Sequence, residues 1–124
     1  MRLIIGGAYQ GKVDFAKDTY DLKEEDVFYC SDGDIDFSKP CIADIEKFTY
    51  ACVQEGIDAL EFFKSRKEEW EKSILICKDI FCGVVPIGAD LRVWTRTTGK
   101  LCQYLSEEAQ SVSRIFCGME QKLK

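Results

Sequence analysis

The sequence contains no histidine in its 124 residues. Serine or cysteine nucleophiles that depend on a histidine base are therefore excluded, as is any metal site that uses imidazole. Carboxylates, lysine, arginine and main-chain amides are the groups that remain for chemistry. Those groups suit phosphoryl transfer, in which a protein mainly positions phosphates and stabilises their charge.

Long apolar runs and long basic runs are also missing. No stretch of about 18 apolar residues exists, so we expect no transmembrane helix. The formal net charge is −5, and an acidic chain without a basic run is poorly suited to bind nucleic acid or a membrane surface. The apolar part of residues 1–12 is too short for a signal peptide and lacks a small-residue cleavage pattern. We therefore expect a cytoplasmic protein.

Cysteine is frequent, but no Cys-x-x-Cys pair is present and no histidine is available to complete a zinc site. The seven cysteines are Cys30, Cys41, Cys52, Cys77, Cys82, Cys102 and Cys117. Most of them lie within apolar runs, and their odd number and wide spacing are unlike those of a secreted disulfide scaffold. We expect buried, free thiols in a reducing compartment.

Short apolar runs alternate with stretches of helical period along the chain. Strands are expected at residues 2–5, 26–30, 41–45, 73–77 and 111–117, and helices at residues 12–22, 46–56, 58–72 and 91–110. The last five residues are also compatible with an edge strand. This alternation implies a parallel sheet with right-handed crossovers. We predict one three-layer α/β domain, residues 1–124, with a mainly parallel sheet of about five strands.

The stretch IIGGAYQGKVDF, residues 4–15, is similar to a phosphate-binding loop. The pattern G-x-x-x-x-G-K-[ST] fits residues 6–12, which lie between an apolar strand and a helix, as the motif requires. Main-chain N–H groups of such a turn and of the helix N-terminus hold phosphate oxygens, and Lys12 would reach the β- and γ-phosphates. The expected nucleotide-binding residues are Gly6, Gly7, Ala8, Tyr9, Gln10, Gly11, Lys12 and Val13. Tyr9 and Gln10, at the tip, either contact a base or substrate or only set the conformation of the loop.

The last position of the motif departs from the pattern. Val13 stands where a serine or threonine hydroxyl would coordinate Mg²⁺. The cradle for an anion is not affected, but Mg²⁺ binding is weakened and needs a carboxylate from elsewhere. Asp44 and Asp79 follow two expected strands, so both should lie at the same edge of the sheet as the loop. Each is placed to hold Mg²⁺ through water, or to serve as a helix N-cap or a turn residue.

Further motifs follow in a fixed order between residues 73 and 118. They are SILICKDIFCGVVP, Arg92-x-Trp94, TGKLCQYLSEEA and IFCG. Together with GGAYQGK they resemble the adenosylcobinamide kinase/adenosylcobinamide-phosphate guanylyltransferase family of cobalamin biosynthesis. The resemblance implies a P-loop NTPase-like fold, a GTP or ATP ligand, a corrinoid substrate and a homo-oligomer. By position, it also implies that Asp44 contacts the nucleotide, that Asp79 matches a family glutamate, and that Arg92 and Gln103 match a substrate- or phosphate-binding pair.

One departure from that family excludes one of its two activities. The family carries a histidine that becomes guanylylated, in a segment between the first helix and Asp44 that is missing here. Guanylyl transfer through histidine is therefore excluded. Three alternatives remain. The chain is an ATP- or GTP-dependent kinase that phosphorylates a hydroxyl such as that of adenosylcobinamide, with Lys12, Asp44 and Asp79 as catalytic residues. Otherwise it is an inactive nucleotide- or phosphate-binding regulatory or assembly module, or a structural domain without a ligand.

Overall fold

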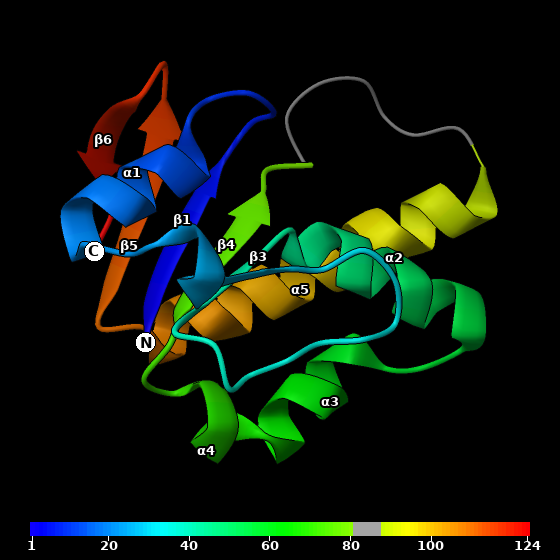
Figure 1. The fold of residues 1–124 in the computed structure, drawn as a ribbon. Coiled ribbons are helices and arrows are strands. Elements are labelled where there is room, and N and C mark those ends of the chain that lie inside the picture. Colours follow the sequence, from blue (N-terminus) through cyan, green and yellow to red (C-terminus); the bar gives the residue numbers. More distant parts are fainter. Residues whose placement is uncertain (81–87) are drawn as a thin grey trace.

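The computed structural model describes residues 1–80 and 88–124. A six-stranded sheet lies between helices (Figure 1). Its strands are β1 (Arg2–Gly6), β2 (Val27–Tyr29), β3 (Cys41–Ala43), β4 (Ile74–Lys78), β5 (Ser111–Phe116) and β6 (Met119–Lys122). The helices are α1 (Lys12–Tyr20), α2 (Ile45–Glu55), α3 (Ala59–Ser65), α4 (Lys67–Trp70) and α5 (Ala89–Glu108), with the 3₁₀-helix η1 (Glu24–Asp26).

The strand order is β2-β3-β4-β1-β5-β6, and only β6 runs antiparallel, against β5. The predicted α/β class with a mainly parallel sheet is confirmed. The sheet has six strands where about five were predicted, and the sixth, β6, overlaps the edge strand that residues 120–124 were compatible with. Cys117 and Gly118 both have positive φ, 52° and 75°, and two such residues form the tight turn that joins adjacent antiparallel strands.

The central strands β1 and β4 are apolar except at their ends, because both faces of the sheet are covered. Leu3 of β1 packs into a cluster with α2, α3 and α5, while Ile4 packs on the opposite face with Ala16 of α1. Successive residues of a strand face opposite sides, so one strand supplies both cores. The result is a three-layer arrangement with α1 on one face and α2, α3 and α5 on the other (Figure 1).

The helix predicted for residues 58–72 is broken into α3 and α4 at Arg66, whose backbone leaves the helical region with φ −119° and ψ 24°. The Phe63 carbonyl accepts the indole N–H of buried Trp70 at 2.8 Å and the Arg66 N–H at 3.2 Å. With those two donors on this carbonyl, the usual bond from four residues downstream is not made. A tertiary contact therefore interrupts a helix that the local pattern favours.

The crossovers reverse direction between β1 and β4. From β1 the chain passes through α1 to β2, at the far edge of the sheet, whereas from β4 it passes through α5 to β5 on the opposite side of β1. In open α/β sheets, ligands bind beyond the carboxyl ends of the strands at such a reversal. Here that place is bounded by Gly6 at the end of β1 and Asp79 after β4. The GVVP part of the sequence motif, with Phe81 and Cys82, lies outside the described residues.

The expectation of buried thiols is confirmed for most cysteines that the structure describes, all of which are free. Cys30, Cys41, Cys52 and Cys77 are buried, Cys102 is half-buried and Cys117 is exposed. Burial raises the pKa of the Cys30 thiol to about 12, and it raises the pKa of Cys41 to about 12 as well. These two thiols are therefore protonated and shielded at neutral pH.

Iodoacetamide at about pH 8 is expected to alkylate Cys117 at least about 100-fold faster than Cys30 or Cys41, because the thiolate is the reactive form and both buried thiols hold their protons. Mass spectrometry of peptides from timed samples measures the three rates. In concentrated urea the rates should converge. Rapid alkylation of Cys30 or Cys41 in native buffer would contradict their burial.

Candidate functional site

The glycine-rich segment forms a short turn between β1 and α1. Tyr9 and Gly11 have positive φ, 58° and 87°, and together they direct the chain from the strand into the helix. Left-handed backbone is easy for glycine but uncommon for tyrosine, and the Tyr9 side chain is fully exposed at the tip. Gly11 is the N-cap residue of α1 and offers no side chain to the first helical N–H groups.

The turn between β5 and β6 holds the tip of this loop from the side. The Gln10 side-chain oxygen accepts the Cys117 N–H at 2.6 Å, and the Gln10 carbonyl accepts the Gly118 N–H at 2.9 Å. These bonds give the Gln10 side chain a structural role, one of the two alternatives that the sequence left open. The turn that leads into the sixth strand, β6, therefore positions the loop.

Main-chain donors remain available along the loop. Within residues 1–80 and 88–124, the N–H groups of Ala8, Tyr9, Gly11 and Lys12 have no hydrogen bond to a protein acceptor. These donors come at the N-terminus of α1, where the helix dipole favours negative charge. The Val13 side chain packs against the apolar cluster between α1 and the sheet, which gives a packing reason for an apolar residue at this position. The loop can therefore receive an anion through its main chain.

Lys12 folds back over the loop. Its Nζ donates to the Gly7 carbonyl at 2.7 Å, and its Cγ and Cδ lie against Gly6, 3.3 Å from where a Cβ would be. Burial lowers the pKa of Lys12, and the nearby carboxylates of Glu46 and Asp44 partly offset that effect. The ammonium group is thus held beside the loop donors, within the field of two acids.

Asp44 occupies the N-cap position of α2 but does not cap the helix. Its side chain makes no capping hydrogen bond, and its backbone is left-handed with φ 59°. Its Oδ2 lies 3.6 Å from Nζ of Lys47. Of the roles considered from the sequence, that of a helix N-cap is therefore not performed. A non-glycine residue in this strained conformation at a sheet edge is a common feature of functional sites.

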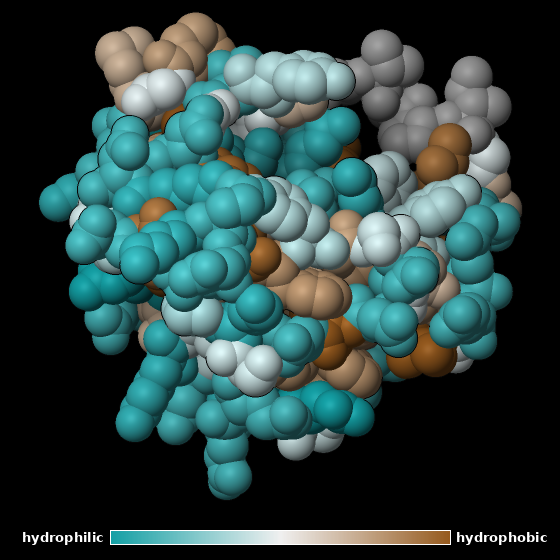
Figure 2. Space-filling model, viewed as in Figure 1, coloured by the Kyte–Doolittle hydropathy of each residue, from teal (hydrophilic) through white to brown (hydrophobic). Residues whose placement is uncertain are grey.

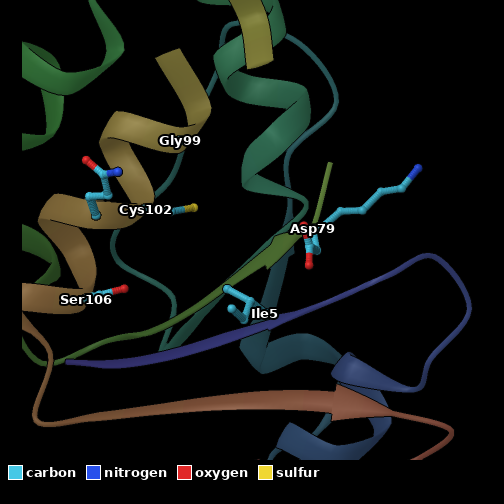
Figure 3. Close-up of a pocket in the computed structure, with 7 residues that line it drawn as sticks. Ile5, Asp79, Gly99, Cys102 and Ser106 are labelled. Carbon is cyan, nitrogen blue, oxygen red and sulfur yellow. The ribbon is translucent and has the colours of Figure 1, made fainter. Parts of the chain in front are cut away.

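Asp79 lies beside the start of the loop, because its N–H donates to the Gly6 carbonyl at 2.7 Å. It also lines a pocket of about 430 Å³ between the end of β4 and α5. The pocket is lined by Ile5, Lys78, Asp79, Gly99, Cys102, Gln103 and Ser106. Figure 3 shows Asp79 at the end of β4, across from the side of α5 that carries Cys102 and Ser106. The structure therefore joins Asp79 and Gln103 in one cavity.

Arg92 is not part of that cavity. It is exposed in the first turn of α5, where its Nε lies 3.4 Å from the Gly88 carbonyl. Gln103 follows eleven residues later on the same helix, which corresponds to about 16 Å along the axis. The two residues that the family resemblance pairs are therefore separated, and of these two only Gln103 lines the pocket that Asp79 lines.

Sequence reasoning missed Glu46. This carboxyl is 5% exposed, and its Oε1 accepts the Lys78 N–H at the end of β4 at 2.9 Å. Its main-chain carbonyl accepts the Trp94 indole N–H at 2.8 Å, which ties α5 to α2. Glu46 begins the helix predicted from residue 46, where an acidic residue is ordinary, so nothing in the local pattern indicated burial. Only its place two residues after Asp44 marked it as close to the sheet edge.

A second pocket of about 400 Å³ adjoins Glu46. It is lined by Ser31, Glu46, Lys47, Tyr50, Lys78, Leu91 and Trp94. The Tyr50 and Trp94 rings meet edge to face, with centroids 5.5 Å apart. Lys78 lines this pocket and the pocket beside Asp79, so the two cavities flank the end of β4.

No protein-family model matches the chain, and no curated protein matches its sequence. In the part of the chain that the structure describes, no helix is long and apolar enough to cross a membrane. The same residues contain no group of three or more cysteine, aspartate or glutamate side chains arranged to hold a metal ion. The motif resemblance, and Mg²⁺ at Asp44 and Asp79, therefore stay predictions.

Proposed function

We propose that this chain binds the triphosphate of ATP or GTP at the loop from Gly6 to Lys12, in a P-loop NTPase-like fold. The observation that carries the proposal is the loop itself: several main-chain donors without an acceptor among the described residues, and one lysine, at the end of a central strand. The loop also lies where the crossover direction reverses, which is the usual ligand position in such sheets.

The activity that follows is a kinase reaction. Lys12 and the loop N–H groups stabilise charge on the γ-phosphoryl group, and Asp79 lies where it can orient an acceptor in the adjoining pocket. The acceptor hydroxyl forms the new O–P bond and gives its proton to Asp79, while the nucleoside diphosphate leaves with the bridging oxygen. Adenosylcobinamide, whose alcohol the motif resemblance suggests, is the first acceptor to test.

Among the residues considered for this site, only the carboxylates of Asp44 and Asp79 would serve as ligands for Mg²⁺. Asp44 and Asp79 supply the oxygen atoms that Mg²⁺ prefers, usually with several waters retained. When bound, the ion neutralises phosphate charge. Val13 supplies no ligand, because its side chain packs against the apolar cluster under α1. The same observation favours a second candidate function, an inactive nucleotide- or phosphate-binding module that regulates or assembles with another protein.

Calorimetry with ATP and GTP, each with and without Mg²⁺, tests the proposal on the wild-type chain and on Val13→Ser. We expect binding to both proteins, with a larger gain from Mg²⁺ for Val13→Ser because the new hydroxyl provides a metal ligand. Nucleoside diphosphate production that requires adenosylcobinamide would identify the kinase. Binding without turnover of any hydroxyl acceptor would favour the regulatory module. If millimolar nucleotide or inorganic phosphate gave no heat of binding, both the kinase and the binding module would be contradicted. The remaining alternative would be a structural domain without a ligand.

A further inference from the structure

Among the residues that the structure describes, no strand pairs with the outer side of β6. β6 is the edge strand beside β5, and all four of its residues are exposed (Figure 1). The Leu123 N–H donates to the Val112 carbonyl of β5 at 2.8 Å. Because antiparallel strands alternate between inward and outward main-chain groups, Met119 and Gln121 also face β5. The N–H and C=O groups of Glu120 and Lys122 therefore face outward.

The side chains along β6 are complementary to those of a second copy of β6 that runs antiparallel to it. Residues 119–123 read Met-Glu-Gln-Lys-Leu. In an antiparallel pair of two copies centred on Gln121, Glu120 of each copy lies opposite Lys122 of the other. Met119 then lies opposite Leu123, and these two apolar side chains are 66% and 52% exposed in the single chain. Every position in this register meets a suitable partner.

We propose that two copies of this chain pair along β6 in a symmetric antiparallel dimer, which joins their sheets into one. The outward main-chain groups of Glu120 and Lys122 supply the hydrogen bonds, and the opposite charges fix the register. Charged residues on an edge strand normally discourage pairing with other edges. Here the two charges have opposite signs and lie two residues apart, so this repulsion is relieved in the self-complementary register.

Two further features support this face as the contact. The Glu120 Oε2 accepts a hydrogen bond from Ser113 Oγ at 2.5 Å, which holds the carboxylate in a defined position beside β5. Figure 2 shows apolar side chains gathered at the upper left, over the turn between β5 and β6, where Phe116 is also 56% exposed. A five-residue edge buries less area than a standard interface, so the dimer should be weak and concentration-dependent.

Sedimentation velocity from micromolar to near-millimolar protein tests the dimer. The wild-type chain is expected to shift from monomer to dimer across this range. Lys122→Glu alone and Glu120→Lys alone should each raise the dimer dissociation constant at least about tenfold, because like charges then face each other at two symmetry-related places. The double swap Glu120→Lys/Lys122→Glu should restore the wild-type constant. Lys72→Glu, which makes the same charge change far from β6, is the control.

Mixing the two single variants gives the sharpest outcome. One chain then has two basic residues at the paired positions and the other has two acidic residues, so a mixed dimer should form where neither variant dimerises alone. Circular dichroism of each variant checks that β6 and the rest of the fold remain. A wild-type chain that stays monomeric throughout the range would overturn the proposal. So would a dimer whose constant does not respond to the charge reversals, since it would use another surface.

Discussion

Replacement of Lys12 by alanine is expected to weaken ATP or GTP binding about 10- to 150-fold, since a hydrogen bond to a charged group contributes about 1.5–3 kcal/mol. The Lys12 Nζ now donates to the Gly7 carbonyl, and it would exchange that neutral acceptor for phosphate oxygens. Its alkyl chain lies along Gly6, so only the ammonium group has to move. Calorimetry on both proteins at one salt concentration measures the change.

Lys17→Ala is the matched control for this variant. Lys17 lies on the same helix but pairs with the exposed Glu24, so its removal should change nucleotide affinity less than about twofold. Equal losses from the two variants would show that general positive charge, not the loop lysine, attracts the nucleotide. If Lys12→Ala bound the nucleotide with unchanged affinity, the proposal that this loop binds the triphosphate would be contradicted.

The pH dependence of binding gives an independent check on the same lysine. Burial, the largest cause, lowers the pKa of Lys12 from its ordinary value of 10.5. The protonated form attracts phosphate, so affinity is full well below this lowered pKa and falls as pH rises through it. Wild-type affinity should therefore begin to fall at a lower pH than expected for an exposed lysine. Lys12→Ala should lack this transition, whereas Lys17→Ala should retain it.

The parts of the fold that follow from local pattern were predictable. Strands buried on both faces, such as β1 and β4, need long apolar runs, and the glycine-rich segment between a strand and a helix could be located from its residues alone. The edge strand β6 was harder, because its turn uses Cys117 in a left-handed conformation that asparagine or glycine usually occupies. The break at Arg66 was hidden because it depends on the Trp70 indole, which reaches back across the helix.

The candidate site was predictable only in part, because tertiary contacts position some of its residues. Asp44 and Asp79 could be placed at the sheet edge because the carboxyl ends of parallel strands meet there. Glu46 could not, because the amphipathic pattern of a helix does not reveal a carboxyl that turns inward to bind a strand N–H. Arg92 and Gln103 belong to successive motifs, yet about three turns of α5 separate them. Spacing along the chain predicts neighbours only where the backbone path is known.

Substitution of Gly6 by alanine is expected to lower the free energy of unfolding by about 2–3 kcal/mol, at the upper end of the usual cost of overpacking. A Cβ at this position would lie 2.6 Å from the Ile115 carbonyl oxygen of β5. That oxygen belongs to the main chain of the paired strand, so no side-chain rotation relieves the contact. The ends of β1 and β5 must separate, and the melting temperature should fall by roughly 8–12 °C.

Gly7→Ala separates this clash from a general need for glycine in the loop. A Cβ on Gly7 would lie 3.6 Å from Cγ of Gln10, an ordinary contact, so the melting temperature should fall by less than roughly 3 °C. The bonds from Cys117 and Gly118 to Gln10 connect the β5–β6 turn to the loop. Separation of β1 from β5 therefore displaces the main-chain donors, and Gly6→Ala should lose nucleotide affinity even at temperatures where it remains folded. Equal melting temperatures for the two variants would mean that β5 moves freely at this point, and the loop would then not be fixed by the sixth strand.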